Sequence, residues 1–106
     1  MITSDKQYTL FANSKVYIFP NRLLVYPTIL PPDYVRCECF GEYDVGNLVN
    51  RQPGAYLNLE FTWSYLLTFS ATGSNDIIRF LNLCEQAVKA HLESIPENSS
   101  VVFTIS

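Results

Sequence analysis

The chain has few residues of the kinds that build phosphate-binding loops. It contains only four glycines among 106 residues, and Gly41 and Gly46 do not have the spacing that precedes a phosphate-binding helix. Seven Lys and Arg against ten Asp and Glu give a net charge of -3, and the basic residues are scattered from Lys6 to Lys89. A surface that neutralises several phosphates of a nucleic acid, or an anionic membrane surface, is therefore not expected.

Long apolar runs and an even set of cysteines are also missing. No run approaches the roughly 20 residues that span a bilayer, and residues 1–6 are not followed by the apolar core of a signal peptide. We therefore expect no integral membrane segment and a cytoplasmic location. The three cysteines, Cys37, Cys39 and Cys84, are an odd number, so we expect buried reduced thiols rather than a disulfide framework.

What the chain has is ample material for one core. Hydrophobic residues make up 48% of the sequence and aromatic residues 14%, which argues against disorder. The length is near the commonest domain size, and two separate domains would each bury too little surface. Residues 1–106 are therefore predicted to form a single domain.

Runs of β-branched and aromatic residues predict most of the first 71 residues to be strands. Val35, Cys37 and Cys39 alternate with Arg36 and Glu38, which indicates a strand with one buried face. A hairpin is predicted from 15–19 to 22–26 around Pro20-Asn21, a proline-rich loop over 27–33, and a turn near Trp63-Ser64. The other predicted strands are 8–12, a short one near 43–45 or 47–49, 56–63 and 65–71.

One amphipathic helix follows these strands. Ser74 or Asn75 can cap its first turn, Asp76 suits its positive end, and Pro96 ends it. At 100° per residue its apolar face is formed by Ile77, Phe80, Leu81, Cys84, Ala87, Val88, His91, Leu92 and Ile95. A final strand is predicted over 101–105. The fold class is therefore α+β, a bent antiparallel sheet or small barrel closed by one C-terminal helix.

Two segments resemble the pleckstrin-homology-like superfamily. The stretch 65–71 followed by the helix from Asp76 to His91 is similar to the last strand and closing helix of that superfamily, and 15–26 is similar to the opening hairpin of its bacterial and GRAM-type members. Phe80 stands where those domains carry a core-facing Trp. The phosphoinositide-binding members place several basic residues on the first two strands, where this chain has only Lys15 and Arg22. The resemblance implies a binding domain, with lipid headgroups as one ligand class.

Residues that could carry chemistry are sparse. Cys37, Cys39, Cys84 and His91 are metal-ligand types, but their spacing matches no common zinc site, and buried structural thiols are the favoured interpretation. Cys84 and His91 lie about 10 Å apart along a helix, which is too far for a nucleophile and base. The acidic residues Glu38, Glu42 and Asp44 are best explained as a solvated face. No catalytic residue, cofactor or metal is predicted, and an enzyme ranks below other functions.

The surplus of aromatic and apolar residues favours binding to another macromolecule. Trp63 shares the register of Leu57, Leu59 and Phe61, which favours burial, but Trp, Tyr and Arg are also enriched in binding hot spots. We predict a non-catalytic protein- or peptide-binding module, working by strand addition or in a groove beside the helix. A self-assembling homo-oligomeric subunit and a lipid-headgroup domain are the alternatives. The candidate partner-binding residues are Tyr17, Arg22, Tyr26, Arg51, Trp63, Tyr65 and Leu83.

Overall fold

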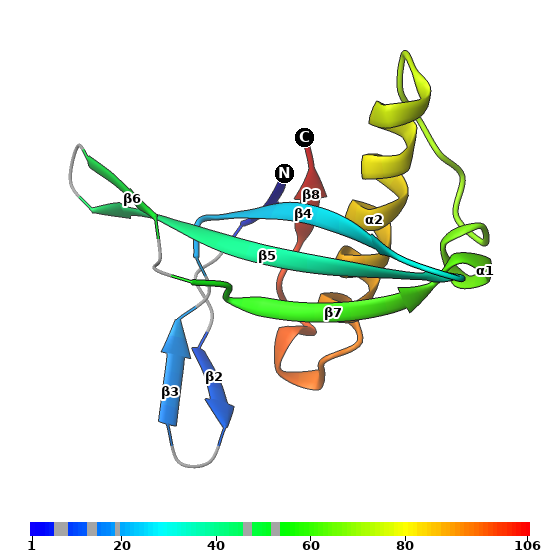
Figure 1. Cartoon of the computed structure of the whole chain (residues 1–106). Coiled ribbons are helices and arrows are strands. Elements are labelled where there is room, and N and C mark those ends of the chain that lie inside the picture. Colours follow the sequence, from blue (N-terminus) through cyan, green and yellow to red (C-terminus); the bar gives the residue numbers. More distant parts are fainter. Residues whose placement is uncertain (6–8, 13–14, 19, 46–47, 52–53) are drawn as a thin grey trace.

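The chain folds into an antiparallel sheet with one long helix packed on one face (Figure 1). The computed structural model describes residues 1–5, 9–12, 15–18, 20–45, 48–51 and 54–106. In chain order the elements are β1 (Ile2–Ser4), β2 (Thr9–Ala12), β3 (Lys15–Ile18), β4 (Arg22–Leu30), β5 (Tyr34–Val45), β6 (Leu48–Arg51), β7 (Leu57–Thr62), α1 (Trp63–Leu66), α2 (Asp76–Glu93), the short 3₁₀ helix η1 (Pro96–Asn98) and β8 (Phe103–Ile105). The α+β class predicted from the sequence is confirmed.

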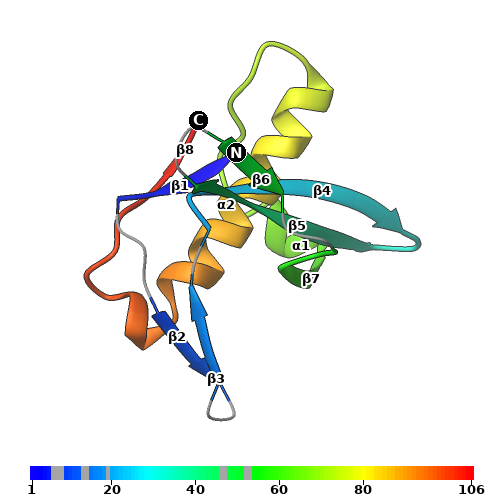
Figure 2. The same cartoon turned by 90° about the vertical axis from the view of Figure 1, so that its left-hand side faces the viewer.

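The main sheet has six strands and is open. Its order is β6-β5-β4-β1-β8, and β7 also pairs with β5. The long strand β5 pairs with β4 along one side and with both β6 and β7 along the other, each antiparallel. Strands β1 and β8 bring the two ends of the chain together, as Figures 1 and 2 show. The described strands form an open sheet, and a closed barrel is not confirmed.

The predicted hairpin over 15–26 is wrong, because its two strands find other partners. β3 pairs with β2 in a separate two-stranded sheet, which projects from the main sheet in both views (Figure 2). β4 instead pairs with β5 from Arg22↔Glu42 to Leu30↔Tyr34. Pro20-Asn21 therefore belongs to the connection between the two sheets and is not the turn of a hairpin. Propensity identifies strands here but does not choose their partners.

The predicted loop over 27–33 is mostly strand. β4 continues through Pro27 to Leu30, and the chain turns only at 31–33. β1 pairs only with Arg22 and Leu23 of β4, so Pro27 lies where β4 has a described neighbour on one side alone. A proline is tolerated at such a position because its missing N–H is not needed by a second strand.

The predicted strand over 65–71 is also wrong. Residues Trp63–Leu66 form the single turn α1, and the Thr62 side chain accepts a hydrogen bond from the Tyr65 amide at 3.2 Å. Leu66 is fully buried beneath the sheet end. The N-cap hydrogen bond of Thr62 and the burial of Leu66 therefore stabilise a helical turn in a segment whose aromatic residues favour a strand.

Helix α2 begins where the sequence predicted it. Asn75 is the N-cap, and its side-chain oxygen accepts from the Ile78 amide at 2.9 Å. The first turn extends beyond the sheet, so Ile77 is exposed, and His91 at the other end is exposed as well. The predicted apolar face is therefore wrong for these two residues. The buried residues of α2 are Leu83, Cys84, Glu85, Ala87, Val88 and Leu92.

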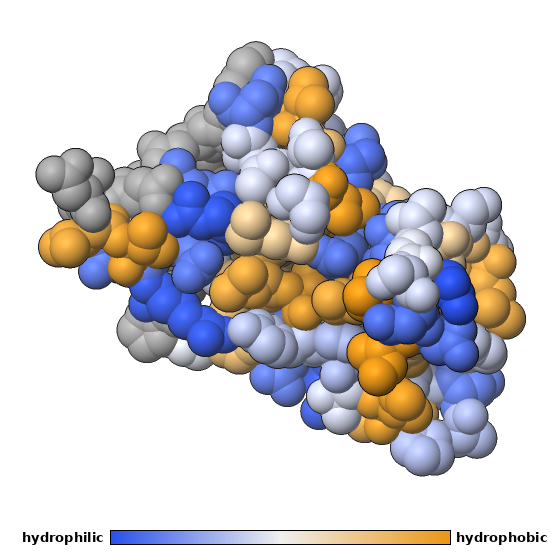
Figure 3. Space-filling model, turned by 90° about the horizontal axis from the view of Figure 1, so that it is seen from above, coloured by the Kyte–Doolittle hydropathy of each residue, from blue (hydrophilic) through white to orange (hydrophobic). Residues whose placement is uncertain are grey.

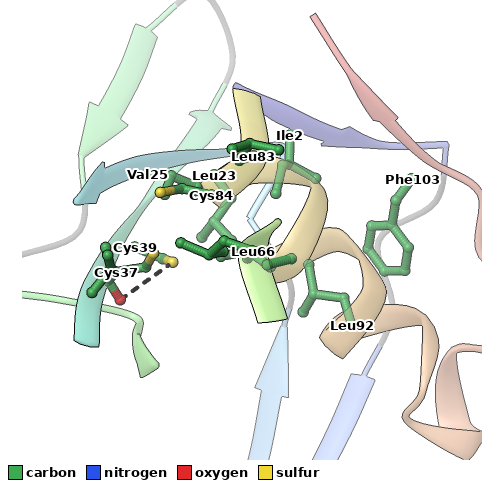
Figure 4. Close-up of a cluster of buried hydrophobic side chains, with 13 residues drawn as sticks. Ile2, Leu23, Val25, Cys37, Cys39, Leu66, Leu83, Cys84, Leu92 and Phe103 are labelled. Carbon is green, nitrogen blue, oxygen red and sulfur yellow. Dashed lines mark hydrogen bonds between the residues drawn. The ribbon is translucent and has the colours of Figure 1, made fainter. Parts of the chain in front are cut away.

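The core lies between this face of α2 and the sheet (Figure 4). The alternation predicted for β5 is confirmed, since Val35, Cys37 and Cys39 are all buried. Ile2 of β1 and Phe103 of β8 complete the core from the two ends of the chain. The buried Glu85 carboxylate forms an ion pair with the α-amino group of Met1, which further ties β1 to α2.

Candidate functional site

An apolar cleft opens at the end of the sheet where three elements meet. It is lined by the end of β4, the turn after it and the start of β5, together with α1 and α2, and its volume is about 300 Å³. Of its lining residues, Val35 is buried, Tyr34 and Trp63 are half-exposed and Ile29 is exposed. We call this the Trp63 cleft; its lining residues are Ile29, Pro32, Asp33, Tyr34, Val35, Trp63 and Phe80.

Backbone hydrogen bonds hold the walls of the Trp63 cleft in place. The Trp63 amide donates to the Asp33 carbonyl at 2.6 Å, which ties α1 to the β4–β5 turn. The Trp63 and Phe80 rings lie 6.0 Å apart between centroids at 42°, so α1 also contacts α2. Because each wall is fixed by a neighbouring element, the cleft is formed before any ligand arrives, as is usual for binding sites.

The charges around the Trp63 cleft are unequal. Asp33 is its only acidic lining residue, and no basic residue lines it in the part of the chain that the structure describes. The nearest basic side chains in sequence are engaged elsewhere: Arg36 pairs with Glu60 at 3.1 Å, and Arg79 pairs with Asp76 at 2.5 Å. The cleft therefore combines aromatic walls with one carboxyl-bearing residue.

Exposed apolar side chains surround this end of the molecule. Figure 3 shows hydrophobic groups at the end that carries α1 and the β4–β5 turn. Leu67, which directly follows α1, is 58% exposed, and Ile77, in the first turn of α2, is 81% exposed. Large apolar side chains grouped around a cleft are typical of interaction surfaces rather than of inert ones. A smaller exposed pair, Leu48 and Val49, lies at the opposite end on β6.

A second hollow lies beside the helix, between α2 and β8. Its volume is about 530 Å³, and we call it the α2–β8 groove. One wall is polar and already engaged: Lys89 pairs with Glu93 at 3.3 Å, and Gln86 donates to the Asn82 side chain at 2.6 Å. Its lining residues are Phe69, Thr72, Asn82, Gln86, Lys89, Ala90, Glu93, Phe103, Thr104 and Ile105.

The structure separates the seven candidate partner-binding residues into groups. Trp63 and Tyr65 both lie on α1 and are each 40% exposed, but Trp63 contacts Phe80 whereas Tyr65 stacks on Phe61 at 5.6 Å. Tyr17 lies in β3, and its side chain is outside the described part of the structure. Leu83, expected at the rim of the helix face, is instead a core residue at 6% exposure. It is not available as a surface contact.

The remaining three candidates lie on the sheet face opposite α2. The Arg51 guanidinium lies 5.3 Å from the Tyr26 ring and 4.8 Å from the Phe40 ring. Arg22 pairs with Glu42 at 3.5 Å on the same strands. The face of β4 that carries Tyr26 is thus partly covered by an arginine, which contributes cation–π attraction of about 0.5–1 kcal/mol at an exposed site.

The thiols are placed for packing rather than chemistry. All three are fully buried and free. Burial, with a smaller effect from Cys37, raises the pKa of Cys39 to about 12. A hydrogen bond to Cys37 and burial also raise the pKa of Cys84. His91 is exposed while Cys84 on the same helix is buried, so they do not form a nucleophile–base pair. Among the described residues no three His, Cys, Asp or Glu side chains gather as a metal site.

Most of the Trp63 cleft was not recognised in the sequence. Ile29, Asp33 and Tyr34 fell in or beside a predicted loop, and Phe80 was assigned to the core-facing stripe of the helix. The available signal was Thr62 followed by Trp63-Ser64-Tyr65, which fits an N-cap and a short helical turn. That signal would have placed an aromatic turn against the start of α2.

Among the described residues, no helix combines the length and apolar character needed to cross a bilayer. Comparisons with family models, curated proteins and solved structures give no match.

Proposed function

We propose that this protein is a non-catalytic protein- or peptide-binding module whose binding site is the Trp63 cleft. The observation that carries the proposal is a preformed apolar cleft of about 300 Å³ surrounded by exposed aromatic and aliphatic side chains. This volume is at the small end of the range for ligand sites, about 300–1,000 Å³, so the cleft suits one inserted side chain. Hot spots of protein interfaces have this form, with an anchor in a pocket and apolar contacts around it.

The proposal does not depend on the superfamily resemblance. The structure has an open α+β sheet, and the more specific pleckstrin-homology-like barrel stays a hypothesis. The proposed site lies instead at the junction of the β4–β5 turn, α1 and α2. Lipid-headgroup binding stays an alternative that acidic liposomes would test directly.

Selection from a displayed random peptide library tests the proposal. We expect peptides that bind the wild-type protein and lose at least about tenfold affinity with Trp63→Ala, because removing an interface hot spot typically costs about 2 kcal/mol or more. Leu48→Ala is the matched control, since it removes an exposed apolar side chain at the opposite end and should leave affinity unchanged. Recovered peptides whose binding is insensitive to both Trp63→Ala and Phe80→Ala would place the site elsewhere and refute the proposal.

Self-assembly by strand addition is the second candidate, and the position of β8 favours it. β8 is the last strand in the sheet order and pairs with β1. The Ser106 amide donates to the Met1 carbonyl at 2.9 Å, so Met1 and Ser106 form a hydrogen-bonded pair of the antiparallel ladder. Such pairs alternate with non-hydrogen-bonded pairs, so the backbone N–H and C=O groups of the next pair, Ile2 and Ile105, point away from the partner strand. The Ile105 amide therefore faces the outer side of β8, where a further strand could bind.

Light scattering over a range of concentrations separates the two candidates. A dimer that dissociates in Ile105→Pro would support strand addition, because proline removes the outward amide while the β1 pairing of Thr104 and Ser106 is retained. Val102→Ala on the same segment is the control and should leave the dimer intact. A monomer at every concentration would exclude self-assembly through β8.

A further inference from the structure

We propose that the Trp63 cleft recognises a cationic side chain, arginine or lysine, of its peptide partner. This inference rests on the proposed binding function and names the chemistry of the residue that enters the cleft. It follows from the aromatic walls, from Asp33 and from the absence of any basic lining residue among those described.

The walls place three aromatic rings beside a ligand in the cleft. Trp63, Tyr34 and Phe80 all line the cleft, and Trp63 and Tyr34 are 40% and 46% exposed, so ring surface is available to a ligand. A guanidinium or ammonium held over such rings is attracted by their negative faces, most strongly by Trp. The remaining apolar residues, Ile29, Pro32 and Val35, suit the aliphatic stem of the same side chain.

The charge of the site selects the sign of the ligand. Asp33 lines the cleft, while Arg36 and Arg79 are each paired with a carboxylate of their own. The whole chain carries a net charge of -3, so long-range attraction also favours a basic partner. An acidic side chain would meet Asp33 and the ring faces, both of which repel it. A purely aliphatic side chain would fill the cleft but would gain neither the attraction of Asp33 nor a cation–π interaction with the rings.

The protein carries its own reporter of this event. Trp63 is the single tryptophan of the chain, so intrinsic fluorescence reads the cleft directly. We would titrate three blocked tripeptides that differ only in the middle residue: acetyl-Gly-Arg-Gly-amide, acetyl-Gly-norleucine-Gly-amide and acetyl-Gly-Glu-Gly-amide. The expected result is a saturable change with the arginine peptide in the millimolar range, and at least about fivefold weaker binding of the other two, as cation–π and carboxylate contacts together predict.

Two charge-matched variants test the role of Asp33. Asp33→Asn should weaken binding of the arginine peptide by about fivefold while leaving the norleucine peptide unaffected. Glu93→Gln changes the net charge equally but lies in the α2–β8 groove, and it should change neither. Thermal unfolding of both variants checks that they are folded.

The outcomes separate this inference from the proposed function. Equal binding of the norleucine and arginine peptides, with no effect of Asp33→Asn, would overturn the cationic ligand but keep an apolar peptide site. Binding of the glutamate peptide as tightly as the arginine peptide would also overturn it. Failure of every tripeptide to change Trp63 fluorescence, although library peptides depend on Trp63, would likewise refute the arginine or lysine assignment. Failure of the library experiment refutes the proposed function itself.

Discussion

At the scale of single residues, Cys39 shows how burial on β5 changes ionisation. Its thiol is fully buried, and burial raises its pKa from 9.0 to about 12. In the unfolded chain the thiol would ionise near its ordinary value, so between these two pH values only the unfolded state has lost the proton. Unfolding then releases a proton, and stability falls as the pH rises.

This difference gives a measurable pH dependence. Stability contributed by Cys39 is fully present below about pH 9 and decreases by about 1.4 kcal/mol per pH unit above it. We expect the free-energy gap between wild type and Cys39→Ala to shrink by about 1.4 kcal/mol between pH 8 and pH 10, measured by urea denaturation. Tyrosines and lysines titrate in both proteins and cancel in the comparison. An unchanged gap would mean that the folded thiol ionises normally.

The residue scale also shows what sequence reasoning does well. The period-two pattern of Val35, Cys37 and Cys39 depends only on which side chains face the core, and the structure confirms it. Trp63 was harder, because the same alternation continues into it from β7. Once α1 begins at Trp63 the period changes from two to 3.6, and the side chain moves from the predicted core face to the cleft.

At the scale of elements, the cap of α2 decides between two residues that the sequence left open. The Asn75 side chain accepts from the Ile78 amide at 2.9 Å and is the N-cap, whereas Ser74 precedes it. Asn75→Ala should therefore destabilise the protein by about 1 kcal/mol, because an amide at the helix start loses its partner. Ser74→Ala is the matched control and should stay within about 0.5 kcal/mol of wild type. Chemical denaturation measures both, and equal effects would contradict the assignment of the cap.

Gly73, just before this cap, is constrained by its surroundings. Its φ is +146°, and a Cβ there would lie 2.6 Å from Cγ2 of Ile78. Gly73→Ala should cost about 1–3 kcal/mol, since it adds backbone strain to a steric clash. Gly54→Ala is the control, because Gly54 also has a positive φ of +75° but nothing within 4 Å of its Cβ position. A greater loss of thermal stability in Gly73→Ala than in Gly54→Ala is the expected result.

Elements were predicted more successfully than their pairing. The helix, the strand from Val35 and the final strand all carry local signals, namely caps, alternation and β-branched residues. Pairing depends on contacts distant in sequence. β4 lies next to β3 in the chain but is hydrogen-bonded to β5 and β1, and no local feature of Pro20-Asn21 distinguishes a tight turn from a passage between sheets. The Trp63 cleft was missed for the same reason, because it requires the β4–β5 turn and α2 to meet.

At the scale of the whole molecule, the last strand closes the core. β8 pairs with β1, and its Phe103 side chain is 4% exposed among the core residues. The fold therefore depends on joining its first and last segments against α2. Joining segments so distant in sequence costs loop-closure entropy, which the contacts of β8 with β1 and α2 must offset.

Phe103 and its neighbour Val102 test this closure. Phe103→Ala should lower the free energy of unfolding by about 3–5 kcal/mol, as large-to-small changes in a packed core do. Val102→Ala should change it by less than about 0.5 kcal/mol, because Val102 is 60% exposed on the same segment. Urea denaturation measures both variants. A loss of unfolding free energy in Phe103→Ala as small as that in Val102→Ala would show that β8 contributes little to the core. Ile105 also packs against this core, so the unfolding free energy of Ile105→Pro must be measured beside its oligomeric state to separate assembly from folding.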